Sequence, residues 1–234
     1  MSDKTSVKWL GHAAFEVLTS GGHRILVDPW ISGNPACPVS ADEVRSPDLI
    51  LITHDHQDHI GEDLPRLIRD SDAQIVCQPD LARKLMADGF PEKNFIYGRG
   101  MNTGGTAQAL DVEITMVQAF HSSGVGSPVG FIITTQEGRR IYHAGDTGIF
   151  DTMKTLGELY PLDLALLPIG SVFVMDPLQA AHSLTMLRPR KVIPMHYGTF
   201  PIMVQTPDEF VSLAGEKAPE VEVVVLEPGE SLAL

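Results

Sequence analysis

Thr53-His54-Asp55-His56-Gln57-Asp58-His59 is the stretch of sequence that decides the fold. It follows an apolar run, Asp48–Thr53, which lacks polar alternation and therefore predicts a strand covered on both faces. In an extended backbone, side chains two positions apart point the same way, so His54 and His56 can bind one metal ion from one side. Asp58 and His59, past the following turn, can then face a second ion.

The alternative is that this polar cluster only caps a helix that begins near Gly61. A single Asp is enough for a cap, whereas residues 54–59 place five ionisable side chains in six positions, so metal binding explains the pattern better. Imidazole and carboxylate ligands without cysteine thiolate suit zinc, iron or manganese.

One loop cannot fill two coordination spheres, so the remaining chain must supply further ligands. Three residues meet this need because each follows a predicted strand: His121 after 112–117, Asp146 after 139–143 and His196 after 191–194. Nearby glycines let the backbone approach closely at each of these places.

Short motifs extend the pattern beyond these seven side chains, namely Gly11-His12-Ala13-Ala14-Phe15, Val27-Asp28-Pro29-Trp30, Ala144-Gly145-Asp146-Thr147 and Met195-His196-Tyr197-Gly198-Thr199-Phe200. From about residue 7 to 200 the sequence resembles the metallo-β-lactamase superfamily, and most closely a branch of bacterial and archaeal metal-dependent hydrolases that mostly lack an assigned substrate. The resemblance implies an α/β fold, a four-layer αββα sandwich with metals in a cleft at one edge of its two sheets. It also implies an assignment of ligands: His54, His56 and His121 to one ion, Asp58, His59 and His196 to the other, and Asp146 as the bridge.

Other residues are expected around these ligands. His12 is expected to line the cleft or support a ligand. Asp28 can accept the free N–H of a ligand imidazole, although an ordinary Asp-Pro turn is an equal alternative. Tyr197, next to a ligand, is a candidate to donate a proton or a hydrogen bond. The pocket is expected to be formed by loops 29–47, 98–106 and 170–176 and by 200–204, with Phe173, Met175, Phe200 and Met203 as an apolar wall or as core residues.

Strands and helices alternate along the rest of the chain. Strands are expected at 7–18, 24–27, 48–53, 74–77, 112–117, 130–135, 139–143, 162–167, 191–194 and 221–226, and helices at about 62–70, 80–88, 149–159, 177–187 and from 207. No linker interrupts this pattern, so residues 1–234 are expected to form a single domain.

Composition limits the functional classes. The chain has 234 residues, of which 43% are hydrophobic, and 17 Lys and Arg against 30 Asp and Glu give a formal charge of −13. This is a globular composition, and its acidity argues against nucleic acid or an anionic membrane as partner. Cys37 and Cys77 form no motif for a disulfide framework or a thiolate zinc site. A polar N-terminus without a long apolar stretch predicts a cytoplasmic protein, and a homo-oligomer is left open.

These observations predict a binuclear metal-dependent hydrolase in which a metal-bound hydroxide attacks a small-molecule ester, lactone, amide or phosphodiester. Asp58, Asp146 and Tyr197 are the candidate catalytic residues. Zinc is the favoured metal, with manganese and iron as alternatives. Two other functions remain open: a mononuclear iron thiol or persulfide oxygenase using His54, His56, His121 and Asp146, and a metal-binding module without catalysis.

Overall fold

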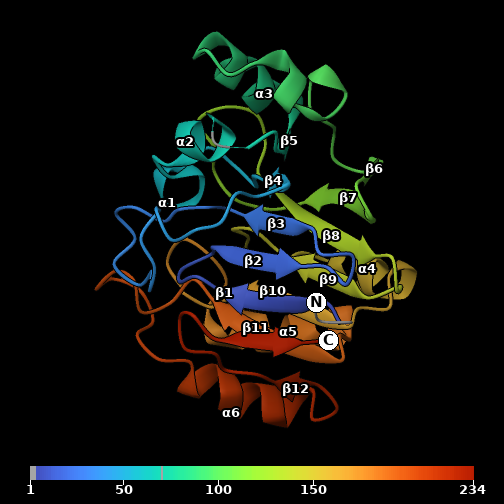
Figure 1. The fold of residues 1–234 in the computed structure, drawn as a ribbon. Coiled ribbons are helices and arrows are strands. Elements are labelled where there is room, and N and C mark those ends of the chain that lie inside the picture. Colours follow the sequence, from blue (N-terminus) through green and yellow to red (C-terminus); the bar gives the residue numbers. More distant parts are fainter. Residues whose placement is uncertain (1–3, 70) are drawn as a thin grey trace.

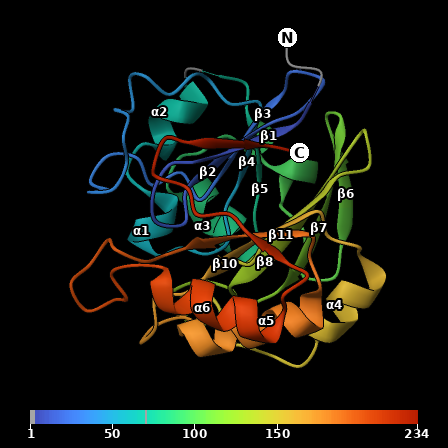
Figure 2. The same cartoon turned by 90° about the horizontal axis from the view of Figure 1, so that it is seen from below.

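Two β-sheets pack face to face between two layers of helices (Figures 1 and 2). This is the arrangement in a computed structural model that describes residues 4–69 and 71–234. Figure 2 shows α1, α2 and α3 on the outer side of one sheet and α4, α5 and α6 on the outer side of the other. The four-layer αββα sandwich expected from the sequence is confirmed.

The first sheet has the strand order β13-β1-β2-β3-β4-β5. Its neighbours β3 and β4, and β4 and β5, pair in parallel, whereas the remaining pairs are antiparallel. The strands are β1 (Ser6–Trp9), β2 (Phe15–Leu18), β3 (Arg24–Val27), β4 (Leu49–Leu51), β5 (Gln74–Val76) and β13 (Ser231–Ala233). The helices of this half are α1 (Gln57–Ile60), α2 (Leu64–Arg69) and α3 (Pro79–Ala87), followed by 3₁₀ turns at Glu92–Asn94 and Ile96–Gly98.

The second sheet has the order β12-β11-β10-β9-β8-β7-β6. Its antiparallel part comprises β6 (Thr106–Ala109), β7 (Val112–Gln118), β8 (Val129–Thr135) and β9 (Arg140–His143). Parallel pairing then continues through β10 (Leu164–Pro168), β11 (Lys191–Met195) and β12 (Glu222–Val223). The helices that cover it are α4 (Met153–Leu159), α5 (Pro177–Leu187) and α6 (Asp208–Lys217).

Three apolar layers hold these elements together. Between the sheets, Phe15 and Leu51 pack in one cluster with Phe131 and Ile193. The outer clusters join the first sheet to α2 and α3, and the second sheet to α4, α5 and α6. Burying each such large side chain contributes about 1.5–3 kcal/mol relative to leaving it exposed. The strand ends are therefore held on a rigid support.

The strands that precede the site end at one edge of the sandwich. β3 and β4 are parallel in the first sheet, and β9 and β11 run the same way in the second. Asp28 directly follows β3, and His196 directly follows β11. His54 and Asp146 come within three residues of the ends of β4 and β9. The polar side chains therefore gather where the apolar strands stop.

The strand expected at 7–18 is wrong, because it is divided into β1 and β2 by a tight turn at residues 10–14. Gly11 has a φ of +92° there, and the amide of Ala14 donates to the carbonyl of Gly11 at 3.0 Å. This turn, rather than a strand, carries His12.

Two short strands were not expected, and the last expected strand is longer than the observed one. β6 is built from small residues that give little strand signal, and β13 returns the end of the chain to β1. Of the strand expected at 221–226, only Glu222–Val223 pairs as β12. The last residue of the helix expected at 62–70 lies outside the described residues. No helix in the described part of the chain combines the length and apolar character that a membrane span requires.

Candidate metal centre

Three histidines converge in a first group at the shared edge of the sheets. Nε2 of His54 lies 3.0 Å from Nδ1 of His56, and Nε2 of His121 lies 3.3 Å from the same Nδ1. His54 and His56 come from the loop after β4, whereas His121 comes from the loop after β7 in the other sheet. The three nitrogens are close enough to bind one metal ion.

A second group contains Asp58, His59 and His196, together with His12. Nε2 of His12 lies 3.3 Å from Oδ2 of Asp58, and the rings of His12 and His196 have centroids 3.9 Å apart. The candidate ligand atoms of these four residues lie within 4.8 Å of one another. His12 was expected as a cleft or supporting residue, and its ring nitrogen is here as near to the group as the expected ligands are.

Asp146 lies between the two groups. Its Oδ2 is 3.0 Å from Nε2 of His196, 3.3 Å from Nε2 of His59 and 3.5 Å from Nε2 of His121. The structure therefore brings all seven side chains of the expected series together, with the carboxylate of Asp146 within 3.5 Å of histidines from both groups.

Asp28 organises the histidines of both groups. Its Oδ2 accepts from Nδ1 of His59 at 2.8 Å and from the hydroxyl of Thr53 at 2.7 Å, and its Oδ1 accepts from the amide of Thr53 at 2.8 Å. Because the Thr53 hydroxyl gives its proton to Asp28, it accepts from Nδ1 of His54 at 2.9 Å. Both imidazoles thus hold a proton on Nδ1 and turn Nε2 toward the site, which is how supporting carboxylates orient metal ligands.

Several atoms of the site lack the partners that buried polar groups normally have. Among the described residues, Nε2 of His12, Nε2 of His59, both ring nitrogens of His196 and Oδ1 of Asp146 are buried and make no hydrogen bond. Buried polar groups are rarely left unsatisfied in proteins. A set of nitrogen and carboxylate donors with these unused atoms fits a divalent metal such as zinc.

The protonation of the imidazoles favours metal binding at neutral pH. Burial lowers the pKa of His54 to about 3 and, against the attraction of the neighbouring Asp58 carboxylate, lowers the pKa of His12 to about 4. Burial also lowers the pKa of His121. These rings are therefore neutral near pH 7, which is the form that binds metal.

The buried carboxylates of the site are stabilised by neighbouring positive charge. Burial acts to raise the pKa of Asp146, but the neighbouring His196 and His59 hold it well below its ordinary value. Burial acts in the opposite sense on His59, yet Asp146 and Asp28 raise its pKa well above the usual value. In the metal-free protein a proton on His59 thus supplies part of the positive charge that metal ions would bring.

The loops of the site hold unusual backbone conformations. His12, Asp28 and His196 all have positive φ values, of 54°, 47° and 59°. Such conformations are costly for residues other than glycine and cluster at functional sites. Asp55 fixes the loop of His121, because its Oδ1 accepts from the hydroxyl of Ser123 at 2.9 Å and from the amide of Gly124 at 2.7 Å.

A cavity of about 330 Å³ opens above these side chains. Three of the four expected apolar residues line it, whereas Met175 is fully buried in the core beside α5 and does not. The expected pocket loops at 29–47 and 98–106 supply none of its lining residues. Trp30 of the first loop lies behind Phe200 and stacks on it, and the second loop is held beside the end of β5, where the amide of Met101 donates to the carbonyl of Cys77. The lining residues are His56, Asp58, His121, Ser122, Asp146, Phe173, His196, Phe200 and Met203.

Tyr197 does not line the cavity. Its ring packs against Trp9 with a centroid distance of 5.4 Å. Burial raises the pKa of Tyr197 to about 12, aided by the charges of Glu227 and Asp208, both of which lie outside the site. This placement does not support the expected role of Tyr197 as a proton donor.

Sequence reasoning missed three supporting residues. Thr53 connects His54 to Asp28, and its position directly before the first ligand was the available signal. His143 donates to the carbonyl of Ala13 at 2.9 Å and accepts from the amide of Gly145 at 3.1 Å, so it fixes the loop of Asp146. Thr199 contacts Nδ1 of His12 at 3.0 Å through its hydroxyl. The contacts of His143 and Thr199 join distant segments and leave no local pattern.

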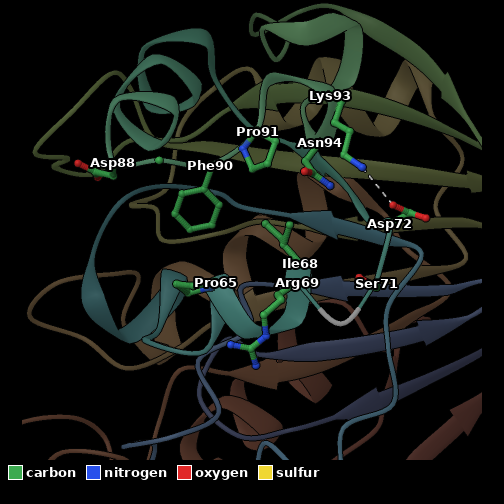
Figure 3. A pocket seen from close by; sticks show the side chains of 11 residues that line it. Pro65, Ile68, Arg69, Ser71, Asp72, Asp88, Phe90, Pro91, Lys93 and Asn94 are labelled. Atoms are coloured by element: carbon green, nitrogen blue, oxygen red, sulfur yellow. Dashed lines mark hydrogen bonds and ion pairs between the residues drawn. The ribbon is translucent and has the colours of Figure 1, made fainter.

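Figure 3 shows a second cavity, of about 410 Å³. It is formed by α2 and by the segment after α3, with Pro65, Ile68 and Phe90 among its lining residues. None of the candidate ligands lines it. Within the described part of the chain, the candidate metal-ligand groups all lie at the edge where the two groups meet.

Comparisons with known proteins agree with this geometry. Residues 23–197 match the family model described as the beta-lactamase superfamily domain. A protein of Nitratidesulfovibrio vulgaris named UPF0173 metal-dependent hydrolase is 46% identical over 231 residues, which cover 99% of this chain and 96% of that protein. A Caldivirga maquilingensis protein of the same name is 49% identical over 229 residues, which cover 97% of each.

Among solved structures, Igni18, a metallo hydrolase from the archaeon Ignicoccus hospitalis, superposes with a TM-score of 0.89 at 38% identity. The match covers 99% of this chain and 98% of Igni18. The matching family model and these full-length relatives give one result: the chain belongs to the beta-lactamase superfamily domain family, in the group named UPF0173 metal-dependent hydrolases.

Proposed function

We propose that this protein is a binuclear metal-dependent hydrolase acting on a small-molecule ester, lactone, amide or phosphodiester. The observation that carries this proposal is Asp146, whose carboxylate lies within 3.5 Å of histidines from both candidate ligand groups. The names of the relatives, metal-dependent hydrolases and a metallo hydrolase, agree with it.

In this proposal His54, His56 and His121 would hold one divalent ion, Asp58, His59 and His196 would hold the other, and Asp146 would serve both groups. His12 supports the second group through its contact with Asp58. Bound divalent ions lower the pKa of water, so that a nucleophile is available near neutral pH, and they polarise the bond under attack.

Asp58 is proposed to accept a proton within the cavity that it lines. Burial acts to raise the pKa of Asp58, but the neighbouring imidazoles of His12 and His59 keep it below its ordinary value. The carboxylate is therefore ionised at neutral pH and can receive a proton from water. Asp28 is proposed to keep the imidazole of His59 in the required orientation throughout.

Zinc is the proposed metal, because all ligand atoms are imidazole nitrogens or carboxylate oxygens. A mononuclear iron oxygenase would need only His54, His56, His121 and Asp146. The convergence of Asp58, His59 and His196 with His12 favours two ions over one. We further propose that the protein is cytoplasmic. We also propose that it binds neither nucleic acid nor membranes, because its 30 acidic residues outnumber its 17 basic ones.

The test is hydrolysis by protein purified without chelator and supplied with zinc, measured against panels of esters, lactones, amides and phosphodiesters. His56→Ala, made and purified in parallel, removes one ligand of the first group. We expect the wild-type protein to turn over at least one substrate class about 100-fold faster than the variant. Equal rates would assign the turnover to a contaminant and contradict the proposal.

A further inference from the structure

Among the described residues, no lysine or arginine lines the cavity above the ligands. Its nine lining residues include histidines, carboxylates, one serine and three apolar residues, but neither lysine nor arginine. Sites that select phosphate or carboxylate groups commonly use arginine forks or lysine ammonium groups to hold them. At this site, an anionic substrate would depend on the metal ions alone.

Lysine and arginine are also absent from the segments of sequence that surround the cavity. Lys and Arg instead lie at the strand ends that are farthest from the site. β3 begins with Arg24, β9 with Arg140 and β11 with Lys191. The seven segments that reach the site edge have neither residue: 9–23, 25–44, 46–65, 100–138, 141–153, 155–187 and 192–216. These segments therefore supply no lysine or arginine to the cavity, although Lys84 of α3 is close enough to interact electrostatically with Asp55 beside the site.

Carboxylates offset most of the charge that metal ions would bring. Asp28, Asp58 and Asp146 place three negative charges against the four positive charges of two divalent ions. Asp55, which holds the loop of His121, adds a further negative charge nearby. The site therefore has little net positive charge with which to attract an anionic substrate. Coulomb attraction is strongest between charges that lie close together, so these nearby carboxylates have the largest effect.

One wall of the cavity is apolar. Phe173 is 55% exposed and Phe200 is 37% exposed, so both rings are available for contact. Phe200 stacks on the indole of Trp30, with centroids 5.9 Å apart and planes at 20°, which fixes its orientation. Val172 and Ile202, beside these residues in the sequence, are also exposed and extend the apolar surface of the two loops.

We propose that the substrate is an uncharged ester, lactone or amide whose apolar part lies on Phe173, Phe200 and Met203, and that phosphodiesters and other anions are poor substrates. This inference rests on the proposed hydrolase function and specifies its substrate class. Water supplies the oxygen of the new bond to the carbonyl carbon, the bond from that carbon to the leaving oxygen or nitrogen breaks, and the leaving group takes up a proton. The product is a carboxylate, whose release is favoured by the acidic edge.

The first test compares zinc-loaded protein on nitrophenyl butyrate, which is neutral, and on bis(nitrophenyl) phosphate, which is an anion with the same leaving group. We expect kcat/KM for the ester to exceed that for the phosphodiester by at least about 100-fold beyond the ratio of their uncatalysed rates. Phe200→Ala should raise KM for the ester by about 10-fold or more, with a smaller effect on kcat, because apolar contact is lost. A preference for the phosphodiester, or an unchanged KM in Phe200→Ala, would overturn the inference.

A charge introduced at the rim gives an independent check. Ile202→Lys adds a cation beside the apolar wall, and Ile202→Gln is its uncharged control of similar length. We expect the lysine variant, but not the glutamine variant, to raise kcat/KM for bis(nitrophenyl) phosphate about 10-fold relative to wild type. If both variants behave alike, the absence of cations does not determine specificity.

A binding measurement separates this inference from the hydrolase proposal. Trp9→Phe leaves Trp30 as the sole tryptophan, so its fluorescence reports on the Phe200 wall. In metal-free protein, benzylacetone should quench this signal at concentrations at least 10-fold lower than hydrocinnamate, its anionic analogue. If no substrate is hydrolysed but benzylacetone still binds more tightly than hydrocinnamate, only the hydrolase proposal is contradicted. Equal binding of the two probes would overturn the inference even if esters are hydrolysed.

Discussion

At the scale of single residues, the site depends on Asp28, a side chain that does not line the cavity above the ligands. It accepts from His59 directly and from His54 through the Thr53 hydroxyl, so one carboxylate orients one histidine in each ligand group. Burial acts to raise its pKa, but the adjacent His59 lowers it below the ordinary value. The carboxylate therefore stays ionised while completely buried.

Asp28→Asn should weaken metal binding by about 10- to 100-fold, because an amide cannot accept from both His59 and Thr53 through the same side-chain atoms. Competition with a chromophoric chelator measures the dissociation constants. Asp48→Asn is the matched control, since Asp48 accepts from the amide of Arg24 at the far end of β3. Equal metal affinity in Asp28→Asn and Asp48→Asn would show that Asp28 does not orient the ligands.

At the scale of elements, the turn between β1 and β2 is what places His12. Gly11 has a φ of +92°, and a Cβ there would lie 2.9 Å from the backbone C and O of Ala36. The indole N–H of Trp9 donates to the carbonyl of His12 at 3.0 Å and fixes the other side of the turn. Both the conformation and the space at this position therefore require glycine.

Gly11→Ala should lower the free energy of unfolding of the metal-free protein by about 2–4 kcal/mol, from left-handed strain and overpacking together. Gly22→Ala, in the turn before β3, has a similar φ of +89° but no neighbour within 4 Å. Gly22→Ala should lower the free energy of unfolding by only about 1 kcal/mol or slightly more, because it introduces left-handed strain without a steric clash. Urea unfolding measures both, and equal losses would mean that the contact with Ala36 relaxes freely.

The turn between β8 and β9 ties the second sheet to the first at the end opposite the site. Glu137 accepts from the hydroxyls of Thr5, just before β1, and Ser20, in the turn after β2. Burial acts to raise the pKa of Glu137, but the hydroxyl donors Thr5 and Ser20 together with nearby backbone groups lower it to about 2. A folded-state pKa below the unfolded value stabilises the protein above the unfolded pKa, and this stabilisation is lost as the pH falls toward 2.

Glu137→Gln should therefore reduce stability at pH 7, by less than about 1 kcal/mol because the side chain is exposed. The difference from wild type should stay constant above pH 5 and shrink between pH 4.5 and 2, where the wild-type carboxylate becomes protonated and resembles the amide. Urea midpoints of the metal-free proteins across this range measure it. A difference that grows on acidification would contradict the assigned pKa shift.

At the scale of the whole molecule, each sheet supplies about half of the metal centre. The loop after β4 brings His54, His56, Asp58 and His59, and the second sheet brings His121, Asp146 and His196. The seven side chains could be predicted from the sequence because each follows or lies close to the end of an apolar strand. The four layers and the position of the site at one sheet edge were implied by the resemblance to the metallo-β-lactamase superfamily.

Features that depend on contacts between distant segments could not be predicted in this way. The turn that carries His12 requires space beside Ala36, and the ring of Tyr197 turns to Trp9 rather than to the cavity. Met175 has the same apolar character as Met203, yet one is in the core and the other lines the cavity. Composition and spacing do not distinguish such cases, because the distinction is made by tertiary packing.

The central claim is that these two halves hold two divalent ions that share Asp146. Plasma emission spectroscopy of protein purified without chelator and equilibrated with zinc counts the ions directly. We predict two per chain for the wild type, one for His56→Ala, and fewer than two for Asp146→Asn. One ion per wild-type chain, or two ions retained in Asp146→Asn, would contradict the shared binuclear centre.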